Sequence, residues 1–390
     1  MSKEKILFTS ESVGSGHPDK LCDQIADAIL DATLALDENA HVAIEVMALA
    51  DTVIIGGEVK AKKRPDFEAI ARSVMRKVGY TSSAIGIDAD KCTVISKVNE
   101  QSENIAQSVN KEDGDIAIQG AGDQGMMFGY ATDETENYMP LAISIAHKLV
   151  RVADNKRHEG VFIDARPDMK SQVTIDYSDP NNIRVDTVVM SVQHEPTYNK
   201  EAFTKYISEE IILPVIKGFG LNTDYVEKIN SSCVFYIGGP LGDTGVTGRK
   251  IIVDTYGGTA RHGGGAFSGK DPSKVDRSGA YMARYIAKNL VAAGVAKRLE
   301  VQLSYAIGEA EPVSIGISTF GTANYSDDVI LKIIRQVFEC RPGLIIENFS
   351  LKKPTFKYQD VTNYGHFGRP DLDLPWEKLD KVNEIKSLLK

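Results

Sequence analysis

The chain has 390 residues, enough for two or three domains, and 42% of them are hydrophobic, as in ordinary globular proteins. Its net charge of −9 disfavours a nucleic-acid binder, which would need a basic face. No apolar run approaches the roughly 20 residues of a membrane span, and the N-terminus does not resemble a signal peptide. We therefore expect a cytoplasmic protein that binds neither membranes nor nucleic acids. Four cysteines without zinc-site spacing indicate reduced, buried thiols: Cys22, Cys92, Cys233 and Cys340.

Helix-like and strand-like patterns alternate along the chain. An apolar stripe after Pro18 predicts a helix over 18–36, and alternation predicts strands over 41–50 and 52–59. A second helix is expected from Pro65 to a glycine cap at Gly79. Further helices are expected near 137–150, 200–216, 278–293 and 327–338, and strands near 172–177, 184–192, 249–254, 300–307 and 312–319. The mixture predicts an α/β or α+β fold with several sheets.

The segment 99–119 is polar and only weakly periodic. A long segment of this kind inside a compact domain is either functional or a plain surface loop. An active-site lid and an inert loop are both consistent with its composition.

Two short glycine-containing motifs are open to a functional and a structural interpretation. Gly14–Lys20, GSGHPDK, leads into a helix N-terminus, where a phosphate could bind, with His17 near a leaving oxygen and Asp19 near a metal. The same residues could simply cap the helix. Gly120–Gly125, GAGDQG, could bring backbone close to a ligand or form a tight turn.

The segment 238–278 carries the strongest signal for function. Glycine makes up about a quarter of it, against the roughly 7% of average proteins. Interleaved are six cations and four carboxylates, a mixture that a core would not bury unpaired. Cations neutralise polyphosphate, carboxylates hold Mg²⁺, and glycines allow close backbone approach. The charged residues are Arg249, Lys250, Arg261, Lys270, Lys274, Arg277, Asp243, Asp254, Asp271 and Asp276.

Residues 264–270 imitate a phosphate-binding P-loop without completing one. The eighth position, which should be Ser or Thr, is Asp271, and Pro272 would interrupt the expected helix. No apolar strand leads into the segment. This argues against a P-loop kinase or ATPase. A further motif, Arg166–Gln172, places Asp168 and Lys170 on one side of an extended segment, either as ligands or as a salt-bridged strand edge.

Together these motifs resemble the methionine adenosyltransferase family, also called S-adenosylmethionine synthetases. GAGDQG and GGGAFSGKD are the two signatures of that family, and FTSESV, GHPDK, RPDMKSQV, GDTGVTGRKIIVDTYGG, DPSKVDRS and YGHFGR also match, over residues 7–378. The resemblance implies three similarly built α/β domains, each a mixed sheet with helices on one face, around a pseudo-threefold axis. We place them at 1–103, 120–237 and 238–390, with a lid or linker at 104–119.

The resemblance also implies a reaction and its participants. Methionine sulfur would attack the ribose C5′ of ATP, and the triphosphate would then be hydrolysed to phosphate and pyrophosphate. It implies two Mg²⁺ ions per active site, a K⁺ ion, and a homodimer or dimer of dimers with shared active sites. The lack of a Ser/His/Asp or Cys/His signature in the sequence agrees with this reaction, because such a displacement needs positioning and electrostatic stabilisation and no covalent protein nucleophile.

Residue roles carry over by position in the motifs. His17 would assist departure of the triphosphate, and Lys170, Arg249, Lys250 and Lys270 would act with it. ATP would also meet Asp168, Phe235, Asp243 and Ala266. Methionine would lie near Glu58, Gln101, Asp243 and Lys274, Mg²⁺ at Asp19 and Asp276, and K⁺ at Glu45.

The chain departs from the family pattern before residue 236. Where the family has Gly-Arg-Phe, this chain has Cys233, Val234 and Phe235, so an arginine is lost and the aromatic residue is kept. Asn104 replaces a common aspartate in the lid. A catalytically silent subunit that only binds nucleotide would be expected to lack His17, Asp19 or the lysines, and all of these are present.

Overall fold

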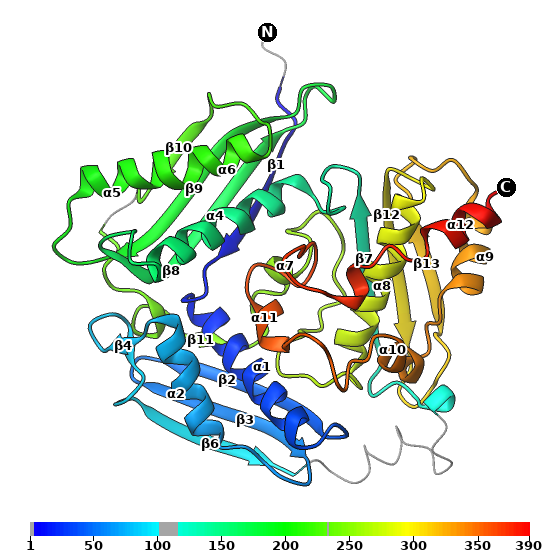
Figure 1. The fold of residues 1–390 in the computed structure, drawn as a ribbon, viewed down its shortest axis with the longest axis horizontal. Coiled ribbons are helices and arrows are strands. Elements are labelled where there is room, and N and C mark those ends of the chain that lie inside the picture. The colour runs from blue at the N-terminus through cyan, green and yellow to red at the C-terminus, as the bar shows by residue number, and fades with distance from the viewer. Residues whose placement is uncertain (1–3, 101–115, 232–233) are drawn as a thin grey trace.

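The computed structural model describes residues 4–100, 116–231 and 234–390. Figure 1 shows three lobes grouped around a common centre, each built on one sheet with its helices packed on one side. This agrees with the expected three-domain α/β architecture. Two small elements lie outside the three main sheets, the hairpin β4 (Thr81–Ser82) and β5 (Ile87–Asp88), and short 3₁₀ turns lie at Ile116–Ile118, Gly239–Leu241 and Pro375–Glu377.

The N-terminal lobe is built on a sheet of order β11-β2-β3-β6. Its strands are β2 (His41–Leu49), β3 (Thr52–Lys60), β6 (Thr93–Asn99) and the short β11 (Gly245–Val246). The helices α1 (Pro18–Leu36) and α2 (Phe67–Val78) belong to this lobe, and α1 packs on β2. Alternation is strict in β2, where Val42, Ile44 and Val46 are buried and Glu45 and Met47 are exposed.

The central lobe is built on a sheet of order β1-β8-β9-β10. Its strands are β1 (Leu7–Val13), β8 (Ala165–Asp176), β9 (Arg184–His194) and β10 (Val226–Ile229). Helix α4 (Leu141–His158) packs on β8 and β1. A second helical rod consists of α5 (Lys200–Tyr206), a π-helical stretch Ile207–Ile212 and α6 (Leu213–Gly218).

The C-terminal lobe is built on a three-stranded sheet of order β13-β12-β7. Its strands are β7 (Gly125–Thr132), β12 (Arg298–Tyr305) and β13 (Ser314–Ser318). Helix α8 (Val275–Ala292) packs on β7 and β12. The remaining helices are α7 (Ile251–Asp254), α9 (Asp327–Val337), α10 (Pro342–Asn348), α11 (Tyr358–Thr362) and α12 (Val382–Leu388). The first two sheets are mixed as expected, whereas this one is antiparallel, because β12 pairs antiparallel with both β13 and β7.

Strands cross between the lobes at three places. β1 comes from the N-terminal part of the chain and pairs with β8 of the central lobe. β7 lies near the start of the predicted central domain, yet it pairs with β12 of the C-terminal lobe. β11 lies near residue 245 and pairs with β2. Since each sheet includes a strand from a distant stretch of sequence, backbone hydrogen bonds link segments that the predicted domain limits separate.

Most sequence-predicted elements are present, with shifted ends. The helix at 18–36 has the predicted bounds, and the next begins at Phe67 with an Asp66 cap and ends at Gly79 in the left-handed conformation. The strand expected at 249–254 is wrong: Ile251–Asp254 form the short helix α7, and the Asp254 amide donates to the Lys250 carbonyl. The three described cysteines, Cys22, Cys92 and Cys340, are buried free thiols as expected.

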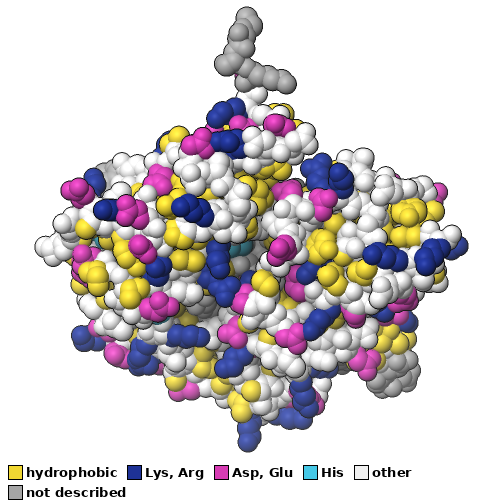
Figure 2. Space-filling model, turned by 45° about the horizontal axis from the view of Figure 1, so that its top comes forward, with side chains coloured by type: hydrophobic (Ala, Val, Ile, Leu, Met, Phe, Trp, Pro, Cys, Tyr) yellow, Lys and Arg dark blue, Asp and Glu magenta, His cyan; other side chains and the backbone are white. Residues whose placement is uncertain are grey.

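The surface carries charges of both signs. On the face drawn in Figure 2, lysines and arginines alternate with carboxylates, and a hollow opens near its middle. None of the helices in the described part of the chain is long and apolar enough to cross a membrane.

Candidate active site

A first group of charged residues gathers around the N-terminus of α1. We call it the first cluster; its members are His17, Asp19, Asp168, Lys170, Asp243, Arg249 and Lys250. His17 caps the N-terminus of α1 and Asp19 lies in its first turn, β8 carries Asp168 and Lys170, and the chain after the Gly239–Leu241 turn carries the rest. The sequence placed all seven in a candidate site, and the tertiary structure brings them together.

His17 is a buried helix cap with a defined ring orientation. Its Nδ1 accepts a hydrogen bond from the Asp19 amide at 3.1 Å, so the ring fulfils the capping role considered from the sequence. Burial, followed by the nearby Lys250 and Lys170 ammonium groups, lowers the pKa of His17 to about 3. The imidazole is therefore neutral at pH 7. With Nδ1 occupied as an acceptor, the proton resides on Nε2, which is a donor.

Asp19 binds the loop that carries the cations. Its Oδ2 accepts from Lys250 Nζ at 2.6 Å, its Oδ1 accepts from the Val246 amide at 2.9 Å, and Arg249 Nε lies 3.7 Å from Oδ1. Burial alone would raise the pKa of Asp19, but the hydrogen bonds from Lys250 and Val246 lower it overall. The carboxylate is thus ionised and paired with a cation that could be released to a phosphate.

Asp168 is buried with one oxygen unsatisfied. Oδ2 accepts from the Gly239 amide at 2.9 Å, and Oδ1 is a buried acceptor without a partner. Burial raises the pKa of this carboxyl to about 6. A ligand donor would satisfy the free oxygen. Phe235 lies on the adjoining segment, where its amide donates to His194 Nε2 at 2.9 Å.

A second group lies farther along the edge and face of the N-terminal sheet. We call it the second cluster; its members are Glu45, Glu58, Lys270, Lys274 and Asp276. Lys270 Nζ donates to Asp276 Oδ2 at 2.6 Å, and Lys274 Nζ donates to Asp271 Oδ2 at 2.7 Å. Burial raises the pKa of Glu45, which lies in the fields of Lys270 and Glu58.

The two glycine-rich signatures both pass beside Asp276. A Cβ on Gly265 would lie 2.0 Å from Asp276 Oδ1, and one on Gly125 would lie 3.8 Å from the same oxygen. A Cβ on Gly122 would meet the Ser273 carbonyl at 2.7 Å. Close approach to Asp276 therefore favours glycine at 265, and close approach to the Ser273 backbone favours it at 122, whereas the 3.8 Å at Gly125 is an ordinary contact.

The segment 264–270 is not a P-loop. Among the described residues no strand leads into it, and α8 begins only at Val275. Instead, the segment docks on the edge of β2: the Ile44 amide donates to the Gly269 carbonyl, and the Asp271 amide donates to Val42.

The two clusters are separate within one chain. The segment before Lys250 pairs with β2 at Met47 and Ala48, and Lys270 bridges to Ala43, so about four residues, or ~13 Å, of strand lie between them. Ion pairs join Lys250 to Asp19 in the first cluster and Lys270 to Asp276 in the second, and among the described residues none joins one cluster to the other. The loop before Lys250 and the loop before Lys270 meet where Ala266 lies against Gly248. Gln101 and most of the lid at 104–119 fall outside the described residues.

Neither cluster is a preformed metal cage. Within the described ranges, no group of three or more His, Cys, Asp or Glu side chains has metal-binding geometry. Asp19 and Asp276 each contact a lysine. Single carboxylates beside phosphate-binding lysines do fit Mg²⁺, which takes one or two protein carboxylates and completes its shell with substrate phosphates and water.

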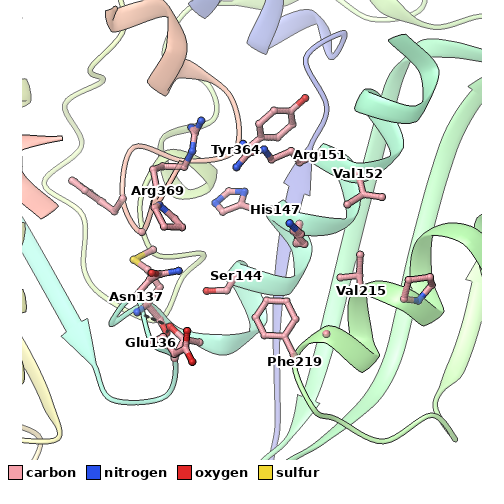
Figure 3. A pocket seen from close by; sticks show the side chains of 18 of the residues that line it. Glu136, Asn137, Ser144, His147, Arg151, Val152, Val215, Phe219, Tyr364 and Arg369 are labelled. Carbon is pink, nitrogen blue, oxygen red and sulfur yellow. Dashed lines mark hydrogen bonds between the residues drawn. The ribbon is translucent and has the colours of Figure 1, made fainter. Parts of the chain in front are cut away.

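A cavity of about 780 Å³ lies away from both clusters. Figure 3 shows side chains of α4, among them Ser144, His147 and Arg151, facing Tyr364 and Arg369 of the C-terminal segment across it. None of the residues predicted for the site lines this cavity.

Sequence reasoning missed two residues that hold the site loops. Asp23 and Asp27 lie on α1 and accept hydrogen bonds from the Gly248 and Gly269 amides, each at 2.8 Å. A signal was present in the sequence, because aspartates recur every fourth residue from Asp19 to Asp31 in an otherwise apolar helix.

Three α/β lobes that present lysines, single carboxylates and close-approaching glycines define a protein suited to binding a polyphosphate. Family models match almost the whole chain: the N-terminal domain of S-adenosylmethionine synthetase at residues 5–103, its central domain at 118–235 and its C-terminal domain at 237–378. The chain belongs to the S-adenosylmethionine synthetase family, which confirms the resemblance seen in its motifs.

Curated relatives support this membership over their full lengths. The chain is 54% identical to an S-adenosylmethionine synthase of Mycoplasma mycoides over 387 residues, which are 99% of this chain and 98% of that protein. It is 55% identical to one of Mesoplasma florum over 97% of this chain and 99% of that protein. It is 52% identical to one of Clostridium tetani over 98% and 99%.

Proposed function

We propose that the first cluster of one subunit and the second cluster of a partner subunit together form the site at which this enzyme works. The reaction itself follows from the family: the chain is a methionine adenosyltransferase that makes S-adenosylmethionine from ATP and L-methionine. The observation that carries the residue assignment is the contact of His17, Asp19 and Lys250 at the start of α1.

An uncovered sheet face supports the shared site. The helices of the N-terminal lobe pack against one face of its sheet, and the other face carries Glu45 and Glu58 beside Met47 and Ile95, which are 37% and 38% exposed. A half-apolar sheet face that carries site residues suits an isologous contact with a second copy. A homodimer, or a dimer of dimers, would then place each second cluster near the partner's first cluster.

The chemistry that we assign to the first cluster is stabilisation of a leaving triphosphate. As methionine sulfur displaces the triphosphate at C5′, negative charge develops on the bridging oxygen and positive charge on sulfur. The neutral His17, protonated on Nε2, can donate to that oxygen. Lys170, Arg249 and Lys250, with Lys270 across the interface, neutralise the phosphates. Lys250 can leave Asp19 for a phosphate when ATP binds.

The proposal assigns the metals by the chemistry of the available oxygens. Asp19 and Asp276 would each hold one of two Mg²⁺ ions, and Glu45 would lie at a K⁺ site. Bound Mg²⁺ would screen phosphate charge and favour the later cleavage of triphosphate to phosphate and pyrophosphate. The raised pKa of Glu45 is consistent with a carboxylate that gains from a nearby cation.

The remaining assignments concern the two organic substrates. Asp168, with its unsatisfied oxygen, would accept from the nucleoside or its phosphates, and Phe235 would stack on adenine next to Ala266 and Asp243. Glu58, Gln101, Asp243 and Lys274 would surround methionine. The lid at 104–119, the domain limits and a cytoplasmic location remain predictions of the same proposal.

One assay tests the proposal against its rivals. Purified protein is incubated with ATP, methionine, Mg²⁺ and K⁺, and the sulfonium product is measured by mass for the wild type and for Lys250→Ala and Lys270→Ala. We expect product from the wild type only, and triphosphate as the enzyme-bound intermediate. Transfer of labelled γ-phosphate would instead favour a kinase, and full activity of both variants would refute the assigned clusters.

A further inference from the structure

Helix α1 presents a row of four carboxylates to distant loops. Asp19, Asp23, Asp27 and Asp31 recur every fourth residue, so they lie along one face of the helix. Each accepts at least one backbone N–H from a segment more than 200 residues away. We call this row the aspartate ladder. Its first residue, Asp19, belongs to the first cluster, whereas Asp23 and Asp27 are not among the predicted site residues.

Asp23 holds the loop that carries the first cluster's cations. Its Oδ1 accepts from the Gly248 amide at 2.8 Å, directly before Arg249 and Lys250. Gly248 has a φ of +77°, and a Cβ there would lie 2.7 Å from the Ala266 methyl group, so the loop has little freedom to rearrange. Asp23 is fully buried, and its second oxygen lies 3.0 Å from the buried Lys20 ammonium.

Asp27 holds the loop that carries Lys270 in the same way. Its Oδ1 accepts from the Gly269 amide at 2.8 Å, and Gly269 has a φ of +80° with its carbonyl bonded to Ile44 of β2. Asp27 is also fully buried and pairs with Arg277 at 2.5 Å. One helix thus holds the backbone two residues before Lys250 and one residue before Lys270.

Burial of so many carboxylates calls for a role other than stability. A buried carboxylate loses its hydration, and its ion pair recovers that loss only in part, so apolar residues would serve a purely structural helix as well. The hydrogen bonds of Asp23 and Asp27 to two loop amides add little to the stability of the fold, but they fix the positions of Lys250 and Lys270 relative to α1. Since misplacement by about 1 Å can cost ~10²-fold in rate, fixed loop positions matter for catalysis.

We propose that Asp23 and Asp27 are positioning residues that set the two triphosphate-binding halves of the active site through the Gly248 and Gly269 amides. The proposal rests on the proposed function, in which Lys250 and Lys270 contact the phosphates. Asp31 supplies a matched control. It occupies the next position on the same face and accepts from the Tyr358 and Gln359 amides at 2.9 and 3.0 Å, but the segment that it holds carries no assigned site residue.

The test combines amide hydrogen exchange with steady-state kinetics on the full-length enzyme. In Asp23→Ala, exchange should accelerate at least ~10-fold in peptides covering 246–250 and remain unchanged at 268–271, and in Asp27→Ala the pattern should reverse. Both should lower kcat by about 10²-fold or more. Asp23→Asn keeps an acceptor for the Gly248 amide and should recover part of the rate.

Two further variants keep the test decisive. Should Asp27→Ala fail to fold because Arg277 is left buried without a partner, Asp27→Ala/Arg277→Met removes both charges together. Asp31→Ala should loosen only the segment near 358 and leave kcat unchanged. A lower kcat without faster amide exchange at the predicted loop would refute the proposal that the ladder positions these loops. Faster amide exchange at the predicted loop together with a normal kcat would refute the catalytic role of the ladder. It would mean that the assignment of Lys250 or Lys270 is wrong.

Discussion

Lys250 donates a 2.6 Å hydrogen bond to Asp19, a residue 231 positions earlier in the chain. This bond joins the helix-start motif to the glycine-rich segment and creates a carboxylate beside two cations. In the proposed site, Lys250 would leave Asp19 to neutralise a phosphate, and the freed Asp19 carboxylate would hold a metal ion.

Asp19→Asn should abolish nearly all S-adenosylmethionine formation with the fold kept. The amide can still accept from the Val246 N–H, but it loses the charge that Mg²⁺ requires. Activity should be measured over a Mg²⁺ titration, and circular dichroism should report the fold. Asp90→Asn, on an exposed surface ion pair, is the control and should behave as wild type. Wild-type activity of Asp19→Asn at low Mg²⁺ would exclude a metal role.

Gly265→Ala should impair the same reaction from the second cluster. A Cβ at this position would lie 2.0 Å from Asp276 Oδ1, so the carboxylate would have to move. We expect at least a ~10-fold higher Mg²⁺ requirement, on the scale of effects from disturbed metal surroundings. Gly218→Ala is the matched control, because nothing lies within 4 Å of its added methyl group. An unchanged Mg²⁺ requirement of Gly265→Ala would remove Asp276 from the metal site.

His17→Ala should separate the two chemical steps. Adenosyl transfer should slow by at least ~10²-fold because the donor to the leaving oxygen is lost, whereas hydrolysis of added triphosphate should fall much less. His17→Asn, which keeps a donor, should recover part of the transfer rate. Both reactions should be assayed on the same three proteins. Equal losses would show that His17 acts only by holding α1 or the shared phosphate site.

The pH dependence of these variants provides a second check on His17. Its pKa of about 3 keeps the ring neutral throughout the working range, so the ratio of wild-type to His17→Ala transfer rates should stay constant from pH 6 to pH 9. A ratio that changes with a midpoint near 6.5 would indicate an ordinary, solvent-exposed imidazole.

Mixed oligomers should reveal whether the site is shared. His17→Ala disables the first cluster and Lys270→Ala the second, so each homodimer should be inactive. In a mixed dimer one site combines both defects and the other combines two intact halves, which predicts about half of the wild-type activity. The two chains are co-expressed with different tags and purified through both. Mixed dimers that stay inactive would place both clusters in a site within one chain.

Asp31→Asn should change stability in a pH-dependent way without changing activity. Burial raises the pKa of Asp31 to about 7 in the folded chain, so between about pH 4 and pH 7 the folded state binds the extra proton and wild-type stability falls as pH rises. Asparagine at position 31 cannot ionise, so the variant does not lose stability in this way. Relative to wild type, the variant's urea midpoint should therefore improve from pH 5 to pH 8. A constant difference between the two proteins would mean that Asp31 is already ionised at pH 5.

Most helices and strands could be predicted from local patterns in the sequence. The apolar stripe and Pro18 predicted α1 with its observed ends, and the glycine cap predicted the end of α2 at Gly79. The motifs identified the family. These features depend on a few consecutive residues, and local periodicity and turn preferences report them well.

Contacts between distant segments could not be predicted from the sequence and became visible only in the fold. Ile-Ile-Val at 251–253 favours a strand locally, yet it forms α7, where Val253 is buried and Asp254 pairs with Lys20. The pairing of β1 with β8 and of β7 with β12 crosses the domain limits for the same reason. Non-local hydrogen bonds and burial outweigh local preferences of a few tenths of a kcal/mol. That is why sequence reasoning named Asp19 and Lys250 separately, and the fold made them partners.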